Sequence, residues 1–376
     1  MVMCTKKCIF GTKQNNMGQN APGFNLDYLP PQRDKVETIE ILRSTSKAAA
    51  ALAELKGIAN TIPNQAMLIN AIVLREAKDS SEIENIITTE DELYKALIIN
   101  QSNISSDTKE VVNYRKAIFH GFDFIKKQGF LRINDIVSIQ QLLVNNTAGI
   151  RSMPGTVLKN DTTGEIVYTP PQDKADILDL LSNFITHFNQ NEQDLSPLIN
   201  LAILHYQFES IHPFYDGNGR TGRILNILYL ILNDLIELPI LYLSSYITEN
   251  KPAYYRLLNQ TNRTGEWEDW ILFMLKAVEQ TSRTTIAKIN IIRQLLDRTI
   301  EEVQQKAPKI YKKELVELLF EMPYSKIEFV VNRLQVERKA ASRYLREMES
   351  IGILESQRVG RETLYINKRL IEVLKK

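Results

Sequence analysis

The stretch that decides the fold reads His212-Pro-Phe-Tyr-Asp-Gly-Asn-Gly-Arg-Thr-Gly-Arg223. It joins two apolar stretches with helical periodicity, residues 198–209 before it and residues 221–233 after it. Gly217 and Gly219 allow the backbone to turn sharply and to approach a ligand without a Cβ in the way. Because the first N–H groups of a helix lack partners within it, a glycine turn that leads into a helix predicts a site for negatively charged oxygens.

The side chains of this segment suit chemistry on phosphates. His212 is the one side chain here that can accept and return a proton near neutral pH. Asp216 offers a hard oxygen ligand for Mg²⁺, which usually keeps waters and substrate phosphates as its other ligands. Arg220 and Arg223 lie on the first turn of the second helix, which we expect to begin near Arg220, so both can face one side. A Gly-x-Gly turn alone would be weak evidence of function. A histidine, an aspartate and two arginines around this turn, all within twelve residues, predict transfer of a phosphoryl-type group.

The segment resembles the signature of the Fic (filamentation induced by cAMP) family, His-Pro-Phe-x-Asp/Glu-Gly-Asn-Gly-Arg-x-x-Arg, and it matches at every defined position. The resemblance covers most of the chain and implies a mainly α fold with a β-hairpin flap. It also implies adenylylation of Ser, Thr or Tyr on a target protein, which can be the protein itself, with ATP and Mg²⁺. Members of the family often form homodimers, so a dimer is a further expectation.

The resemblance assigns roles within the segment. It implies that His212 deprotonates the attacking hydroxyl and that Asp216 holds Mg²⁺. Asn218 and the loop amides would hold the α-phosphate, and Arg220 and Arg223 the outer phosphates. Glycine at position 219 favours nucleotidyl transfer, because the related kinase-like branch has lysine there. The nucleotide-binding residues implied by the segment are Asp216, Gly217, Asn218, Gly219, Arg220, Thr221, Gly222 and Arg223.

A second stretch, Ser80-Ser-Glu-Ile-Glu-Asn85, resembles the inhibitory pattern of the family, Ser/Thr-x-x-x-Glu-Gly/Asn. Ser80, Glu84 and Asn85 are its defined positions, and its place in the same chain implies intramolecular inhibition. Glu84 would pair with Arg223 and occupy the guanidinium group that orients the γ-phosphate, an interaction worth about 1–3 kcal/mol. The alternative is an ordinary capped helix end with a solvated glutamate. In some relatives this glutamate is thought to orient a water that removes AMP, so a reverse reaction stays open.

Residues 145–171 are rich in turn-forming residues. Two short segments with a preference for β-strand, residues 156–158 and 165–169, flank a polar turn. We expect a β-hairpin here. By resemblance it is the flap, whose backbone would pair with the target peptide as an edge strand and whose side chains would cover adenine. A plain surface hairpin is the alternative. The residues that the resemblance brings to the adenosine are Ile166, Val167, Tyr168, Thr169, Tyr254 and Asn262, although Tyr254 would equally suit a position in the core.

The chain divides by composition into four parts. Residues 1–35, rich in Asn, Gly, Pro and Gln, are expected to form an extended arm, and residues 36–110 a helical region with the inhibitory motif. Residues 111–306 would be the catalytic core. Residues 307–376 show three short helical patterns, 312–321, 326–334 and 338–350, and then a strand pair, 353–356 and 363–366. This order predicts a winged helix-turn-helix, an arrangement common in bacterial members.

Charge supports one alternative function. The whole chain is nearly balanced, with 46 basic and 45 acidic residues, which argues against a nucleic-acid coat or a membrane-surface protein. Residues 309–376, however, hold 15 Lys/Arg against 10 Asp/Glu, a net charge of +5. The alternative is therefore a DNA-binding regulator with a nucleotide-sensing core. The expected recognition helix carries Arg338, Lys339, Arg343 and Arg346, but also Glu337, Glu347 and Glu349, and winged helices also dock proteins.

No apolar run approaches the roughly 20 residues that a membrane-spanning helix needs. The longest candidate, residues 224–238, is interrupted by polar residues such as Asn233. The N-terminus has no apolar stretch long enough for a secretion signal, and Cys4 and Cys8 are expected to be free thiols. We therefore expect a cytoplasmic protein with no membrane partner.

Overall fold

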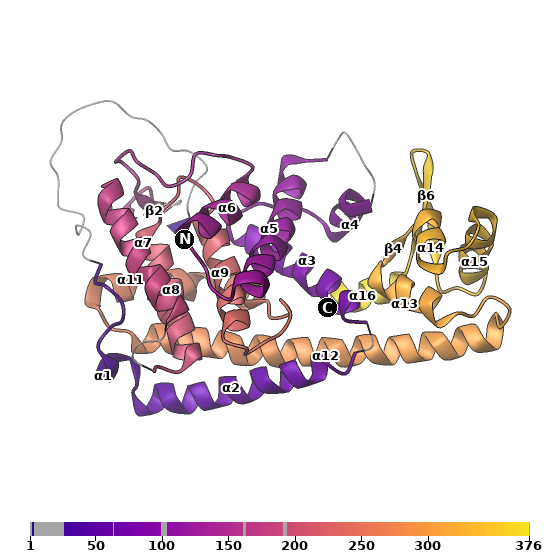
Figure 1. Cartoon of the computed structure of the whole chain (residues 1–376), viewed down its shortest axis with the longest axis horizontal. Helices are drawn as coiled ribbons and strands as arrows, with labels where there is room; N and C mark the ends of the chain where they lie inside the picture. Colours follow the sequence, from indigo (N-terminus) through magenta and orange to yellow (C-terminus); the bar gives the residue numbers. More distant parts are fainter. Residues whose placement is uncertain are drawn as a thin grey trace.

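The computed structural model describes residues 2–3, 26–62, 64–98, 104–160, 163–190 and 194–375. This part of the chain is mainly helical, as predicted, with two small sheets (Figure 1). Most of the expected N-terminal arm, residues 4–25, lies outside the described residues. Its end differs from the prediction, because helix α1 (Arg33–Val36) begins inside the range expected to be extended. Residues before α1 are tied to the core, since Leu29 exchanges hydrogen bonds of 2.7 and 2.9 Å with the Asn183 side chain.

Helices α2 (Ile39–Ala59) and α12 (Glu268–Lys306) run side by side along one edge of the molecule (Figure 1). The sequence of α2 explains this pairing, because one face buries apolar residues such as Ala48, Leu52 and Leu55 at helical spacing. Helices α3 (Gln65–Ile83) and α4 (Glu90–Ile98) follow α2. Helix α5 (Ser106–Gln128) then crosses the predicted boundary between residues 110 and 111. The N-terminal region and the expected core therefore share one hydrophobic core, with no linker between them.

Helices α8 (Pro197–Ile211) and α9 (Asn218–Leu232) pack at the centre, surrounded by α5, α6 (Ile133–Val144) and α7 (Lys174–Asn189). Nearly every residue of α8 and α9 is buried, which matches their apolar sequences. Helix α9 begins at Asn218, two residues before the position that the sequence predicted. Gly217 makes this earlier start possible with φ of +80°, a conformation that glycine adopts without strain. Helices α10 (Leu243–Glu249) and α11 (Lys251–Thr264) complete this part.

The expected hairpin is present as β2 (Leu158–Asn160) and β3 (Ile166–Tyr168), paired antiparallel. The first strand lies two residues later in the chain than predicted. A short strand, β1 (Val2–Met3), pairs with the other side of β2, so the sheet order is β1-β2-β3. Strand β3 is therefore an edge strand in the described sheet.

The C-terminal region contains α13 (Lys313–Glu321), β4 (Tyr324–Ser325), α14 (Ile327–Leu334), α15 (Arg338–Ser350), β5 (Glu355–Val359), β6 (Glu362–Ile366) and α16 (Lys368–Lys375). The sequence predicted its three helices and the hairpin, within two or three residues, but neither β4 nor α16. Strand β4 was missed because two residues show no periodicity. This region packs against α3 and α4, where Arg75 donates to the Leu374 and Lys375 carbonyls and Tyr324 donates to Asp91 at 2.6 Å. No helix within the described ranges is long and apolar enough to cross a membrane.

Candidate active site

A cavity lies where α3, the hairpin, α8, the start of α9 and α11 meet. The structure thus brings together residues that are far apart in the sequence. The sequence-predicted site residues that line this cavity are Glu84, Val167, Tyr168, His212, Gly219, Arg223, Tyr254 and Asn262.

His212 ends helix α8 and adopts a left-handed conformation with φ of 48°. Its side chain is buried and faces the cavity. Burial and the nearby charge of Arg151 together lower the pKa of the imidazole to about 4, against a backbone hydrogen bond to Glu209 that raises it. The imidazole is therefore neutral near pH 7 and able to accept a proton, as a general base must be.

The loop between α8 and α9 is held by its own side chains. Asn218 donates to the Phe214 carbonyl and accepts from the Phe214 N–H, both at 2.8 Å, and the ring of Phe214 is fully buried. The Asn218 side chain therefore closes the loop, and the role of Asn218 at the α-phosphate stays a prediction. The N–H groups at the start of α9 remain available for an anion.

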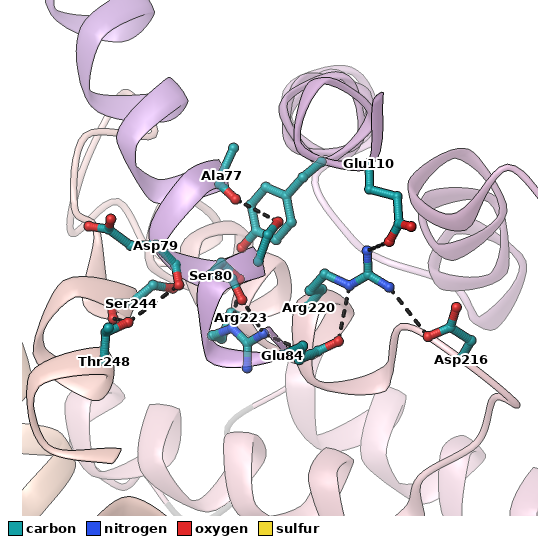
Figure 2. Close-up of polar contacts among 12 residues, drawn as sticks. Ala77, Asp79, Ser80, Glu84, Glu110, Asp216, Arg220, Arg223, Ser244 and Thr248 are labelled. Atoms are coloured by element: carbon teal, nitrogen blue, oxygen red, sulfur yellow. Dashed lines mark hydrogen bonds and ion pairs between the residues drawn. The ribbon is translucent and has the colours of Figure 1, made fainter. Parts of the chain in front are cut away.

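Arg220 is fully buried and contacts three carboxylates (Figure 2). Its Nε lies 3.1 Å from Glu84 Oε2, its Nη1 lies 2.9 Å from Glu110 Oε2, and its Nη2 lies 3.3 Å from Asp216 Oδ1. In the structure Arg220 joins α3, α5 and the loop, and Glu110 is a partner that sequence reasoning missed. The predicted role of Arg220 at the outer phosphates stays a prediction.

Arg223 binds the inhibitory stretch (Figure 2). Its Nη2 lies 2.8 Å from Glu84 Oε1 and 2.9 Å from the Ser80 carbonyl, and its Nε donates to Ser80 Oγ at 2.6 Å. The predicted contact between Glu84 and Arg223 is present, and Glu84 also binds Arg220. The alternative of a solvated glutamate is wrong, because only 14% of the Glu84 side chain is exposed.

Charge and backbone geometry explain why Glu84 is held here. Burial would raise the pKa of Glu84, but the charges of Arg220 and Arg223 outweigh this effect, and its pKa lies below the usual value. The carboxylate is therefore ionised at neutral pH. Asn85 follows in a left-handed conformation with φ of 62°, which explains why Gly or Asn suits this position at the end of α3.

Gly219 lets Glu84 approach the loop. A Cβ at this position would lie 2.6 Å from Glu84 Oε1 and 3.0 Å from Arg223 Nη1, so these side chains would have to shift. Gly222 is likewise crowded, because a Cβ there would lie 2.6 Å from Glu209 Oε1. Neither Gly222 nor the buried Thr221 is among the residues that line the cavity; both support the first turn of α9.

Asp216 is the candidate ligand for Mg²⁺. Half of its side chain (51%) is exposed, and Oδ1 accepts from Arg220. Within the described part of the chain, no group of three or more His, Cys, Asp or Glu converges as a metal site. A single exposed carboxylate suits Mg²⁺ only when phosphates and waters supply the other ligands. The residues present therefore fit an ion that arrives with a nucleotide.

The hairpin covers one side of the cavity. Val167 and Tyr168 line it, and the Tyr168 hydroxyl donates to the Ser210 carbonyl at 3.0 Å, which ties the hairpin to α8. Ile166 is 40% exposed, and neither it nor Thr169 is among the lining residues. Of the four hairpin residues predicted to cover the adenosine, Val167 and Tyr168 therefore line the cavity and the other two do not.

Helix α11 also contributes to the lining of the cavity. Tyr254 reaches it, but its hydroxyl hydrogen-bonds His205 at 2.9 Å and its ring packs near Trp270, so much of this side chain belongs to the core. Asn262 accepts hydrogen bonds from the hydroxyls of Tyr206 and Ser210 at 2.8 and 3.1 Å. Sequence reasoning missed three other lining residues of α11, namely Tyr255, Leu258 and Asn259. Their spacing relative to Asn262 could have identified them, because residues three and four apart share a helix face.

Glu209 is a further cavity residue that sequence reasoning did not identify. It lies in α8 one turn before His212 and is buried, and burial raises its pKa to about 7, against the charge of Arg223 that lowers it. A glutamate within an otherwise apolar helix was the available signal.

Three family models match successive parts of the chain. The Fic/DOC family N-terminal model matches residues 42–123, and the Fic/DOC family model matches residues 130–230. A third model, described as the C-terminal domain of SoFic-like protein adenylyltransferases, matches residues 295–370. The first two models meet between residues 123 and 130, later in the chain than the boundary that composition suggested.

Curated relatives match shorter stretches. A protein adenylyltransferase Fic from Nematostella vectensis is 25% identical over 168 residues, which cover 44% of this chain and 37% of the relative. A probable protein adenylyltransferase from Aquifex aeolicus is 38% identical over 69 residues, 18% of this chain and 22% of the relative. The chain thus spans well under half the length of these relatives.

Solved structures share the fold. A Fic family protein from Desulfovibrio desulfuricans G20 aligns with a TM-score of 0.58 at 18% identity, over 90% of this chain and 98% of the other. A Fic domain containing signaling protein from Bacteroides thetaiotaomicron aligns with a TM-score of 0.53 at 17% identity, over 66% and 97%. The family models matched at residues 42–123 and 130–230, with the complete motif at residues 212–223, show that the chain is a Fic domain protein.

Proposed function

We propose that this chain is a protein adenylyltransferase, which transfers AMP from Mg-ATP to a Ser, Thr or Tyr hydroxyl of a target protein and is inhibited by its own Glu84. One observation carries this proposal: the neutral imidazole of His212 faces the same cavity as Gly219 and Arg223, at the positive end of helix α9. The relatives named protein adenylyltransferase support the reaction type.

The residues divide the chemistry among them. His212 accepts the proton of the attacking hydroxyl, whose oxygen forms a bond to the α-phosphorus of ATP. The bond from this phosphorus to the β-phosphate oxygen breaks, and pyrophosphate leaves. N–H groups at the start of α9 stabilise the charge that develops on the α-phosphate oxygens. Asp216 would hold Mg²⁺, which neutralises phosphate charge when bound.

The walls of the cavity suit a purine nucleoside. Leu158 and Val167 of the hairpin and Tyr255 and Leu258 of α11 contribute to the lining of the cavity, and most of the exposed lining surface is apolar. Strand β3 has an open edge in the described sheet, to which an extended target segment could add as a further strand. The target hydroxyl would then be presented beside His212.

Inhibition follows from the partners of Arg223. While Arg223 binds Glu84 and Ser80, its guanidinium group is not free to orient the outer phosphates of ATP. Glu84 is ionised at neutral pH and shares the cavity with His212. The same carboxylate therefore supports a reverse reaction as well, in which it orients a water that removes AMP from a modified protein.

The direct test is mass spectrometry of proteins that gain AMP. The chain is incubated with ATP, Mg²⁺ and a cell lysate, and peptides are searched for an AMP adduct on Ser, Thr or Tyr. We expect adducts on this protein or on a lysate protein when Glu84 has been replaced by glycine. A folded Glu84→Gly protein that binds ATP and adds no AMP to any protein would contradict the proposal.

A second candidate function is DNA binding by the C-terminal region. Arg338, Lys339, Arg343 and Arg346 are all exposed on α15 and line one groove with Ile327 of α14. Three helices and a three-stranded sheet in this order would form a winged helix-turn-helix with α15 as the recognition helix. Under this proposal the core senses nucleotide while the C-terminal region contacts DNA phosphates.

We expect binding to random-sequence duplex DNA at low salt, measured by gel shift, if this second candidate holds. The double replacement Arg343→Ala and Arg346→Ala should weaken binding about tenfold or more and reduce its dependence on salt, because fewer phosphates are neutralised. Arg293→Ala on α12, also exposed, is the matched control and should bind as the unmodified protein does. If the DNA shows no gel shift at low salt, DNA binding is excluded as a function. The proposal of AMP transfer does not depend on this result.

A further inference from the structure

Arg151 lies in the segment before the hairpin, and its side chain is fully buried. Within the described residues its hydrogen-bond acceptors are all backbone carbonyls. Its Nε donates to the His212 carbonyl at 2.8 Å, and its Nη2 donates to the Ile211 carbonyl at 3.3 Å and to the Pro171 carbonyl. A buried arginine normally faces a carboxylate, so one that faces only carbonyls calls for an explanation.

The positions of these carbonyls explain why a buried arginine faces them. The Ile211 carbonyl belongs to the peptide group before the His212 Cα, and the His212 carbonyl belongs to the peptide group after it. One guanidinium group therefore holds both peptide planes that set φ and ψ of His212. The backbone N–H of Arg151 also donates to the Pro213 carbonyl at 3.0 Å, which holds the next plane.

This fixation matters because His212 has φ of 48°, a region that residues with a side chain seldom occupy. Helix α8 ends here, so its last carbonyls have no N–H partner within the helix. The Arg151 guanidinium group supplies that partner and a positive charge at the negative end of the helix. Pro171 follows the hairpin, so the same group also joins the hairpin to the end of α8.

We propose that Arg151 is the positioning residue for His212: it fixes the backbone that carries the imidazole, links this backbone to the hairpin, and places a positive charge beside the ring. This inference rests on the proposed function only in taking His212 as the base. The charge of Arg151 opposes protonation of the ring and so favours the neutral form that accepts a proton.

Other groups also act on the ring. Glu84 of α3 raises the pKa of His212, as does the backbone of Glu209 in α8. Arg223 of α9 and Tyr168 of β3 line the same cavity. Burial and Arg151 outweigh the groups that raise it, and the pKa lies near 4. Removing the charge of Arg151 should therefore raise the pKa toward the ordinary value of 6.5.

The test is NMR of the protein labelled with ¹³C at histidine Cε1, which needs no substrate. The chain has only four histidines, and His212→Gln identifies the signal of interest. We expect His212 to stay neutral down to about pH 5 in the unmodified protein, and its titration midpoint to rise by about one unit or more in Arg151→Met. Arg75→Met is the matched control, because Arg75 also donates to backbone carbonyls but lies on α3 beside the C-terminal region.

A second measurement separates positioning from simple stability. In the Glu84→Gly protein, the transfer rate per folded molecule should fall about 10- to 100-fold in Arg151→Met, with little change in the KM for ATP, because a misplaced base slows the chemical step. Arg151→Lys keeps the charge but not the fork, so it should retain the low titration midpoint while the rate still falls. If Arg151→Met does not fold, Arg151→Lys alone carries the test by its rate.

The outcomes are distinguishable from failure of the proposed function. An unchanged His212 titration and an unchanged rate in a folded Arg151→Met protein would overturn the inference. If Glu84→Gly transfers no AMP while the His212 midpoint still moves in Arg151→Met, the proposed reaction fails and the role of Arg151 at His212 stands.

Discussion

Replacing Glu84 with glycine is expected to increase AMP transfer by about tenfold or more. The carboxylate binds Arg223 at 2.8 Å and Arg220 at 3.1 Å, and both guanidinium groups are buried. A coupling of about 1–3 kcal/mol corresponds to about 5- to 150-fold in an equilibrium, and two buried ion pairs place this case toward the upper part of that range. Transfer is measured with labelled ATP and Mg²⁺, on the protein itself or on a lysate.

Neighbouring residues provide the controls. Glu84→Gln removes the charge with little change of shape and should also activate, whereas Glu82→Gln, on the same helix turn but 43% exposed, should not. In the activated protein, Arg223→Ala should weaken ATP binding, because the outer phosphates lose their cation. Transfer that stays flat in both Glu84 variants would show that Glu84 does not inhibit. If Arg223→Ala leaves the affinity for ATP unchanged, Arg223 does not bind the phosphates.

The second large effect is expected from His212→Ala in the Glu84→Gly protein. Loss of a general base lowers a rate by about 10²- to 10⁴-fold, so AMP transfer should fall below detection in most assays. Binding of ATP should change little, because the anion site consists of the helix start and Arg223. Label transfer and isothermal calorimetry with ATP, carried out on the same preparations, measure the two properties separately.

A different histidine provides the comparison. His120 of α5 hydrogen-bonds Ser138 and is not among the cavity residues, so His120→Gln should not reduce transfer. Residual transfer in the His212→Ala protein at more than about a tenth of the parent rate would exclude His212 as the principal base. Loss of ATP binding would instead indicate that the imidazole helps to form the nucleotide site.

Some parts of the site could be predicted from the sequence because the residues involved are local. His212, the two glycines and Arg223 lie within one turn and the helix that follows, so their spacing alone places them around one anion site. The helices on either side were recognisable from apolar periodicity. The contact between Glu84 and Arg223 was expected only through the family pattern, since no rule of spacing connects residues 139 positions apart.

Other parts depended on contacts between distant elements. Glu110 meets Arg220 across 110 positions, and Arg151 meets His212 across 61, yet neither stands in a recognisable motif. The Asn218 side chain bonds the backbone of Phe214, because a buried amide must satisfy its own hydrogen bonds. Two of the four hairpin residues, Ile166 and Thr169, are not among the residues that line the cavity, and strand alternation does not explain this because Val167 and Tyr168 are consecutive.

By itself, the sequence determined the Fic motif, the helix pair that carries it and the residue types able to act on a phosphate, because each depends on neighbours within a few positions. Only the tertiary structure decided that Glu84 joins two arginines, that Arg220 also contacts Glu110, and that Arg151 holds the backbone of His212. Those outcomes follow from packing α3, α5 and the hairpin against one loop, where buried charges and carbonyls take whichever partners the fold brings within reach.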